Sequence, residues 1–197
     1  MINDLDLFKP DFAFDLIDLS NSADIYTIMR DNGIVRAYAY TMVFRPKPFL
    51  YDFLKVGMSA PKLEERREYQ VGERVVRQLA WLPGWKHEPP YSDNGSAFWN
   101  TINRQLIQEK KILPSSFNKN NLSVGIWDVS KRAKNNDIVS SDEELTLAQW
   151  AEGELTSQYK KKFGRLPLLN IIDPSKSKVY AGAVIRKSTL KQFIEFV

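Results

Sequence analysis

The chain has no cysteine and only one histidine among its 197 residues. Without cysteine there can be no disulfide bond and no zinc site built on thiolates. The single histidine, His87, excludes the usual metal motifs that use two histidines, and a serine–histidine triad would have to use it. No apolar run approaches the roughly 18 residues of a membrane-spanning helix. The first residues are acidic and unlike a secretory signal, so we expect a cytoplasmic protein, bacterial or from a phage, with no membrane partner.

The apolar residues that are present suffice for one domain with a sizeable core. Hydrophobic residues make up 43% of the sequence and aromatic residues 12%, as in a typical globular protein. The formal net charge of +4 is unevenly distributed. Residues 1–34 contain seven aspartates against one lysine and one arginine, a net charge of −5, so the remainder carries +9. A basic body favours a polyanionic partner such as nucleic acid, because lysine and arginine release counterions when they contact phosphates.

Residues 1–34 are predicted to form an acidic, aromatic arm followed by a short helix. Phenylalanines and leucines lie among the aspartates of the arm, so we expect it to pack rather than to be disordered. It could cover an edge of the core or join a dimer. Ser22 is a suitable N-cap for a helix to Met29, and Asn32-Gly33 would end that helix.

The next segment predicts a β-hairpin. Tyr38 to Phe44 alternates with period two, which is typical of a strand. A second apolar run extends from Phe49 to Val56, and we expect this strand to end at Gly57. Pro46 and Pro48 indicate the turn between the two strands.

A helix dense in charge is expected after the hairpin, from Lys62 to Gln70. Its side-chain spacing places Arg66 beside the hairpin, with Arg67 as the competing candidate. The alternative is that both arginines lie on the surface and pair with Glu64 and Glu68, and Tyr69 could contact a phosphate or be a surface tyrosine. The other expected elements are a helix or strand over Val75–Trp85, a loop containing His87, a helix over Phe98–Lys111, a strand over Leu122–Val129 that could join the hairpin as a third, and a polar surface loop over Lys131–Asp142.

A long helix is predicted from about Asp142, an N-cap candidate, to Phe163, with Gly164 just beyond its end. One stripe of this helix, by three- and four-residue steps, contains Leu145, Ala148, Glu152, Leu155 and Tyr159. Glu152 therefore interrupts an apolar face, whereas Glu154 points elsewhere. A carboxylate among core-facing residues is costly unless it is paired, protonated or bound to a metal.

The order of these parts resembles the GIY-YIG nuclease superfamily. Tyr38-Ala39-Tyr40 stands where that family has Gly-Ile-Tyr, and Lys55-Val56-Gly57 stands where it has Tyr-Ile-Gly. The catalytic arginine, the helical glutamate and the asparagine after a proline correspond to Arg66, Glu152 and Asn170. A lysine in place of the second tyrosine resembles one subgroup, among the type II restriction nucleases.

The resemblance implies an α+β fold with a small, three-stranded, mainly antiparallel sheet flanked by helices. This core would span residues 35–173, with loop insertions. The arm and short helix of residues 1–34 would precede it, and a C-terminal extension of residues 174–197, a strand and a helix, would follow. We expect a single structural domain overall.

The resemblance also implies a mechanism of phosphodiester hydrolysis. Glu152 is expected to bind one Mg²⁺ or other divalent cation, which can act as a Lewis acid and orient the phosphate. Tyr40 is implied as the base or as a relay to the attacking water, and Lys55 could supply the nearby positive charge that a tyrosine needs to act at neutral pH. Arg66 would clamp the phosphate with its planar donor group. Possible supporting residues are Tyr38, Gly57, Arg67, Tyr69, His87 and Asn170.

These inferences predict a sequence-specific endonuclease that cuts double-stranded DNA, in the manner of a type II restriction enzyme. A chain of this size with one active site cuts one strand, so we expect a homodimer that places two sites on opposite strands. Two alternatives remain. One is a nucleic-acid-binding domain without catalysis, and the other is a structural or interaction protein of phage or bacterial origin.

Overall fold

The computed structural model describes residues 5–19, 22–34, 36–47, 50–60, 71–79, 119–134, 141–170 and 172–178. Several predicted elements lie outside these ranges. They are the charged helix with Arg66, Arg67 and Tyr69, the loop with His87, the helix over Phe98–Lys111 and the C-terminal strand and helix. Within the described ranges no helix is both long and apolar enough to cross a membrane.

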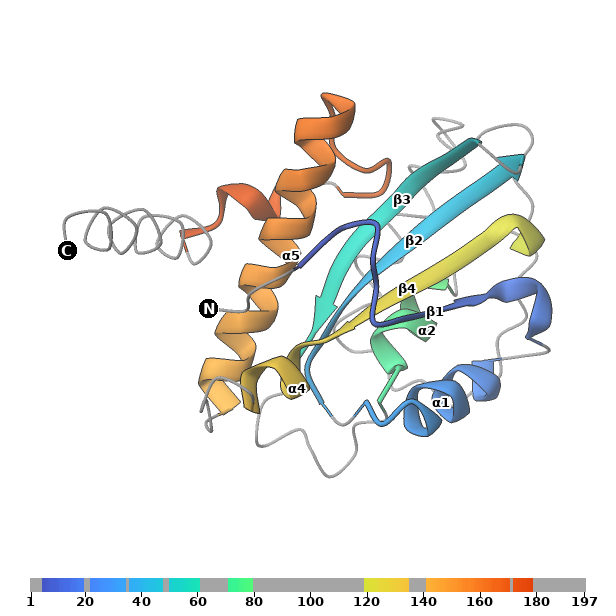
Figure 1. The fold of residues 1–197 in the computed structure, drawn as a ribbon, viewed down its shortest axis with the longest axis horizontal. Coiled ribbons are helices and arrows are strands. Elements are labelled where there is room, and N and C mark those ends of the chain that lie inside the picture. The colour runs from blue at the N-terminus through green and yellow to red at the C-terminus, as the bar shows by residue number, and fades with distance from the viewer. Residues whose placement is uncertain are drawn as a thin grey trace.

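The fold is mixed α+β, as predicted, around one antiparallel sheet of four strands (Figure 1). The strands are β1 (Phe12–Asp15), β2 (Tyr38–Lys47), β3 (Leu50–Ser59) and β4 (Leu122–Asp128), in the order β1-β4-β2-β3. The predicted third strand is thus β4, which pairs with β2. The prediction of three strands missed β1, which the arm adds along the other side of β4.

The strand β1 forms because its phenylalanines alternate. Phe12 and Phe14 are half-buried, whereas Ala13 and Asp15 are exposed. Before β1, the arm crosses one face of the sheet (Figure 1), where a Cβ atom on Gly125 would come within 3.2 Å of Pro10. The arm therefore covers an edge of the core, one of the two roles expected for it.

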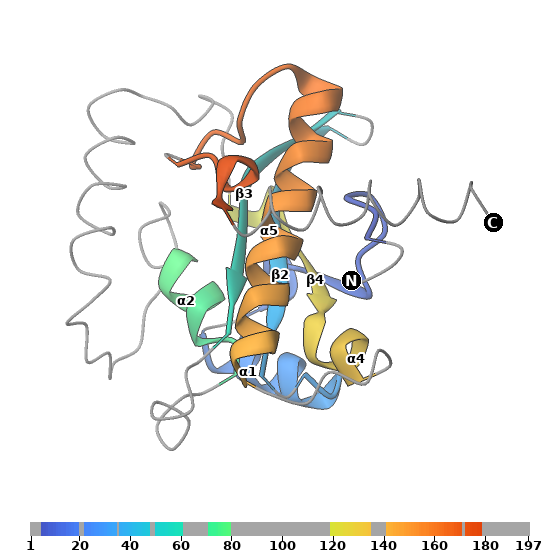
Figure 2. The ribbon, with the colours of Figure 1, turned by 90° about the vertical axis from the view of Figure 1, so that its left-hand side faces the viewer.

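Two apolar clusters lie on the two faces of the sheet. One contains Tyr38 and Tyr40 of β2 together with residues of α1 (Ser22–Asp31) and α2 (Glu73–Leu79). The other joins the sheet to the start of the arm and to α5 (Ser141–Phe163). Figure 2 shows α2 and α5 on either side of β3. The edge strand β3 is therefore the place where residues from both layers can meet.

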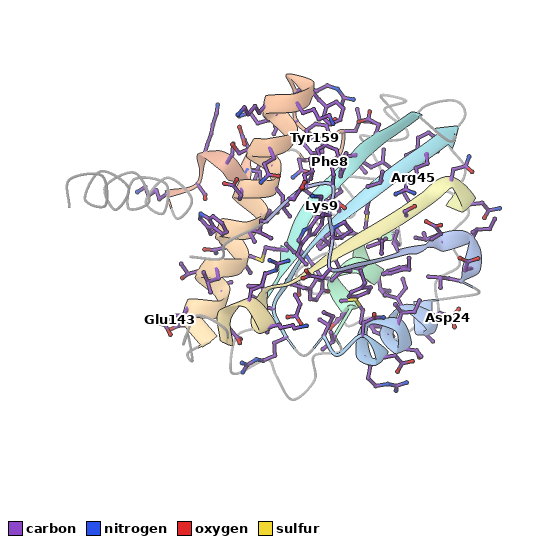
Figure 3. The ribbon with its side chains drawn as sticks, in the orientation of Figure 1. Phe8, Lys9, Asp24, Arg45, Glu143 and Tyr159 are labelled. Atoms are coloured by element: carbon purple, nitrogen blue, oxygen red, sulfur yellow. The ribbon has the colours of Figure 1, made fainter. Side chains whose placement is uncertain are left out.

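The arm packs directly on α5. The Gln158 side chain accepts a hydrogen bond from the Leu7 N–H (2.9 Å) and donates one to the Leu5 carbonyl (2.8 Å). The Phe53 ring lies at 5.8 Å from the Phe8 ring and at 5.6 Å from the Tyr159 ring, edge-on to both. Figure 3 labels Phe8 of the arm and Tyr159 of α5 in this region.

The predicted helices agree with the structure where it describes them. The helix α1 begins at Ser22, and the Gly33 and Ile34 N–H groups bond the Arg30 and Met29 carbonyls at its end, which is a Schellman motif. Its last residue is Asp31 rather than Met29. The helix α5 begins at Ser141, one residue before the predicted N-cap, and ends at Phe163 as predicted. Of the segment predicted as helix or strand, the described part is helical.

Three details of the prediction were wrong. Gly57 lies inside β3 rather than at its end, because the strand continues to Ser59. Pro46 lies within β2, where the register with β3 is irregular between Phe44 and Lys47, so its missing N–H costs no hydrogen bond between the strands. The helix α4 (Val129–Lys134) occupies the start of the predicted surface loop, because the Asp128 side chain accepts a hydrogen bond from the Lys131 N–H (2.8 Å) and caps it.

Candidate active site

Tyr40 and Gly57 face each other across β2 and β3. A Cβ atom on Gly57 would lie 2.4 Å from both Cζ and Oη of Tyr40, so the tyrosine ring lies directly over the glycine. Tyr40 is almost fully buried, as is Tyr38, whose ring centroid is 6.3 Å away. The two predicted aromatic residues therefore lie side by side in the core layer next to α1 and α2.

Lys55 lies on the same face of the sheet as this pair. It is two residues before Gly57 in β3, and residues at that spacing point to the same side of a strand. The register also shifts here, because Lys55 pairs with Met42 whereas Phe53 pairs with Val43. Leu54 is thus an extra residue, a β-bulge, and such irregularities redirect neighbouring side chains.

The segment after α5 lies along the free edge of β3, and we call its described residues, 165–170 and 172–176, the clasp. The Leu169 N–H bonds the Leu54 carbonyl (2.8 Å), and the Lys55 Nζ donates to the Leu169 carbonyl (3.1 Å). The Asn170 side chain accepts from the Val56 N–H and donates to the Val56 carbonyl, both at 2.9 Å. Asn170 thus satisfies the two backbone groups that an edge strand would otherwise leave unpaired.

Asn170→Ala is expected to lower the free energy of unfolding by about 2 kcal/mol, because it leaves the buried N–H and carbonyl of Val56 without partners. Urea denaturation followed by circular dichroism measures this change. The matched control is Asn32→Ala, since Asn32 is exposed and its side chain donates only to the Ile28 carbonyl. A loss no greater than that of the control would contradict the role given to Asn170.

Glu152 faces this edge from α5. As predicted, it interrupts an apolar stripe, since Ala148, Leu155 and Tyr159 are buried while Glu152 is half-buried. Burial raises the pKa of Glu152 from 4.5 to about 7, against the opposing effects of the Lys55 and Arg74 charges. The carboxyl group is therefore part protonated and part ionised near neutral pH.

The pKa of Lys55 shifts in the opposite direction. Burial lowers it from 10.5 to about 8, the negative charge of Glu152 raises it, and the positive charge of Arg74 lowers it further. A carboxyl group with a raised pKa beside an amine with a lowered pKa is typical of catalytic sites, although structural charge networks also shift pKa values in this way. No ion pair within 4.0 Å joins Lys55 to Glu152 in the described part of the chain.

Arg74 is the member of this group that the sequence did not reveal. It is exposed on α2, next to the buried Val75 and Val76. The only signal was its place in a short helical segment after Gly72, whose positive φ of 100° marks a break before that helix. Arg74 joins the group only through the packing of α2 against the sheet, which no local sequence pattern predicts.

The structure thus brings together Lys55, Glu152 and Asn170, with Arg74 added, and places Tyr38, Tyr40 and Gly57 in the adjoining layer of the sheet. Arg66, Arg67, Tyr69 and His87 lie outside the described residues.

Glu152 is the carboxylate of this group that can bind a divalent cation. The described residues contain no group of three or more histidine, cysteine, aspartate or glutamate side chains that could hold a metal. A lone carboxylate with a raised pKa fits a cation whose remaining ligands are water and substrate phosphate, as is usual for Mg²⁺. The nearby charges of Lys55 and Arg74 oppose binding of a cation without such an anion.

Comparison of the chain with protein-family models, with curated proteins and with solved structures found no match.

Proposed function

We propose that this protein is a divalent-metal-dependent endonuclease that hydrolyses double-stranded DNA, similar to the type II restriction enzymes of the GIY-YIG superfamily. The observation that carries the proposal is the arrangement at the edge of β3. There burial raises the pKa of Glu152 on α5 and lowers the pKa of Lys55 on β3, the strand whose Gly57 lies under the Tyr40 ring. The basic charge of the chain beyond residue 34 supports a polyanionic substrate.

Each residue has a role in this proposal. Glu152 would hold the cation, which when bound supplies Lewis-acid chemistry at the phosphate. Tyr40 takes a proton from the attacking water, directly or through a second water, and Lys55 supplies the positive charge that favours the phenolate. Arg74, together with Arg66 of the helix predicted from the sequence, binds the phosphate oxygens through planar guanidinium groups.

The hydrolysis adds one water across one P–O bond. The water oxygen bonds to phosphorus, the bond from phosphorus to the leaving sugar oxygen breaks, and that oxygen gains a proton. A homodimer with two such sites would cut both strands, and a two-fold protein suits a palindromic recognition sequence.

The test incubates the full chain and its variants with mixed-sequence duplex DNA in Mg²⁺ or in EDTA. We expect discrete fragments in Mg²⁺ and intact DNA in EDTA. Arg74→Gln should lower kcat/KM by about 10- to 100-fold, the value of a hydrogen bond to a charged group. The matched control is Arg30→Gln, an exposed arginine of α1 that pairs with the adjacent Asp31.

Intact DNA across a broad set of duplexes and several divalent metals would refute the nuclease proposal. Retained binding of uncut DNA at low salt would then indicate a binding domain. Absence of binding would indicate a structural or interaction protein.

A further inference from the structure

The clasp is tied to the folded core at both of its ends. At its start, Arg165 pairs with Asp52 of β3, whose other carboxylate oxygen accepts a hydrogen bond from the Tyr159 hydroxyl at 2.8 Å. Near its end, the Lys160 Nζ of α5 lies 2.7 Å from the Asp173 Oδ2. The middle of the clasp, Leu169 and Asn170, therefore lies between two ion pairs that fix its ends.

The middle of the clasp touches three consecutive residues of β3. Its backbone bonds Leu54, its Leu169 carbonyl accepts from the Lys55 amine, and its Asn170 side chain brackets Val56. Leu169 is four residues from Asp173, a span of at most about 14 Å for an extended chain. Only three residues separate Leu169 from Asp173, so we expect a shift at Asp173 to displace the Leu169 carbonyl that holds Lys55.

We propose that the Lys160–Asp173 ion pair positions Lys55 indirectly, through the clasp and without contact to Lys55. The pair holds the far end of the clasp on α5, and so keeps the Leu169 carbonyl at the Lys55 amine and Asn170 on Val56. The coupling from the ion pair to the edge of β3 stands on the geometry alone, whereas its consequence for catalysis rests on the proposed nuclease function.

The Lys160–Asp173 pair is suited to this role because it is sheltered. The Asp173 side chain is 13% exposed, against 63% for Asp31 in the surface pair with Arg30. Burial opposes the ionisation of Asp173, but hydrogen bonds from Lys160 and Ser175 and the charge of Lys160 outweigh it and lower the pKa of Asp173. The ion pair is therefore intact throughout the neutral range, where its effect on Lys55 and Glu152 would matter.

Amide hydrogen exchange by NMR tests the coupling without reference to activity. The Val56 and Leu169 N–H groups bond across the junction between β3 and the clasp. In Asp173→Asn and in Lys160→Gln we expect both amides to exchange about tenfold faster than in the wild type. The exchange rate of the Gly57 amide should not change. The Val56 N–H and carbonyl point outward to the clasp, so those of the next residue, Gly57, point inward to β2.

Two variants are needed because Asp173 also caps the short turn at Pro174–Lys176, whereas Lys160→Gln leaves that cap in place. Asp31→Asn, which removes an exposed partner of the same type, is the matched control and should leave all three amides unchanged. Unchanged exchange of Val56 and Leu169 in both pair variants would overturn the proposal, whether or not the protein cuts DNA.

Separate measurement of kcat and KM distinguishes a positioning role from a merely structural one. In both pair variants we expect kcat for Mg²⁺-dependent cleavage to fall about tenfold, the scale of a small misplacement of a catalytic group, while KM stays the same. Asp173→Glu, which keeps the carboxylate, should have a kcat close to that of the wild type. Faster exchange with unchanged kcat would overturn the positioning role. If the wild type cuts no DNA, the nuclease function fails and the exchange rates alone decide the coupling.

Discussion

Glu152→Gln is expected to lower the rate of Mg²⁺-dependent cleavage by about a hundredfold to a thousandfold, the scale seen when one preorganised electrostatic group is removed from an active site. Glutamine keeps the size of the side chain but loses the negative charge that would bind a cation. Steady-state kinetics on a duplex containing the cleavage site would measure the loss. The matched control is Glu154→Gln, two residues along α5, where the carboxylate accepts a hydrogen bond from Gln158 instead.

Glu152 and Lys55 are also expected to destabilise the fold, because burial makes the ionised form of each side chain unfavourable. The double variant Lys55→Met, Glu152→Gln removes both charges and should therefore be about 1–2 kcal/mol more stable than the wild type near neutral pH, even after the loss of the hydrogen bond from Lys55 to the Leu169 carbonyl. Greater stability together with lost activity is the combination expected of a functional site. A less stable double variant at pH 7.5 would contradict it.

The pH dependence of this gain follows from the directions of the two pKa shifts. The folded pKa of Glu152, about 7, lies above 4.5, so the unfolded chain loses that proton first and wild-type stability falls between pH 4.5 and 7. The folded pKa of Lys55, about 8, lies below 10.5, so stability recovers between pH 8 and 10.5. Urea unfolding of both proteins should show the largest difference between pH 7 and 8, with smaller differences near about pH 5 and about pH 10.

Gly57→Ala is expected to lower the free energy of unfolding by about 1–3 kcal/mol, the cost of adding a methyl group to a well-packed core. The added carbon would overlap Cζ and Oη of Tyr40 at 2.4 Å, and this ring is buried among residues of α1 and α2. The ring must move away from Gly57 or the two strands must separate, so we also expect cleavage to fall. Urea denaturation and cleavage rates measure the two effects.

A second substitution separates the Tyr40 overlap from other causes. In the Gly57→Ala background, Tyr40→Leu removes the ring atoms that collide and should cost less than it does alone. The double-mutant cycle then yields a favourable coupling energy of about 1 kcal/mol or more. Additive effects would show that the cost of alanine arises elsewhere in β3.

The parts of the fold that were predicted correctly are those with a strong local pattern. Alternation over Tyr38–Phe44 and Leu122–Val129 predicted β2 and β4, and the stripe through Glu152 predicted both α5 and the inward-facing carboxylate. Asn32-Gly33 predicted the end of α1 because glycine accepts the positive φ, here 72°, that this helix end requires.

The parts that were missed depend on contacts distant in the sequence. The bulge at Leu54 is a property of the register between two strands, and no single-strand pattern predicts it. Arg74 joins Lys55 and Glu152 only through the packing of α2 against the sheet. The strand β1 was missed because its partner, residues 123–126, lies more than 100 residues further along the chain.

That pairing between β1 and β4 has a consequence for the order of folding. Residues 12–15 leave the ribosome long before residues 123–126, so nascent β1 has no strand to pair with while the hairpin of β2 and β3 is already complete. Hairpins form within microseconds, whereas β1 can pair only after β4, more than 100 residues further along the chain, has been made. The first strand in the sequence is therefore the last to join the sheet, and until it docks the β4 edge is open to the strands of other chains.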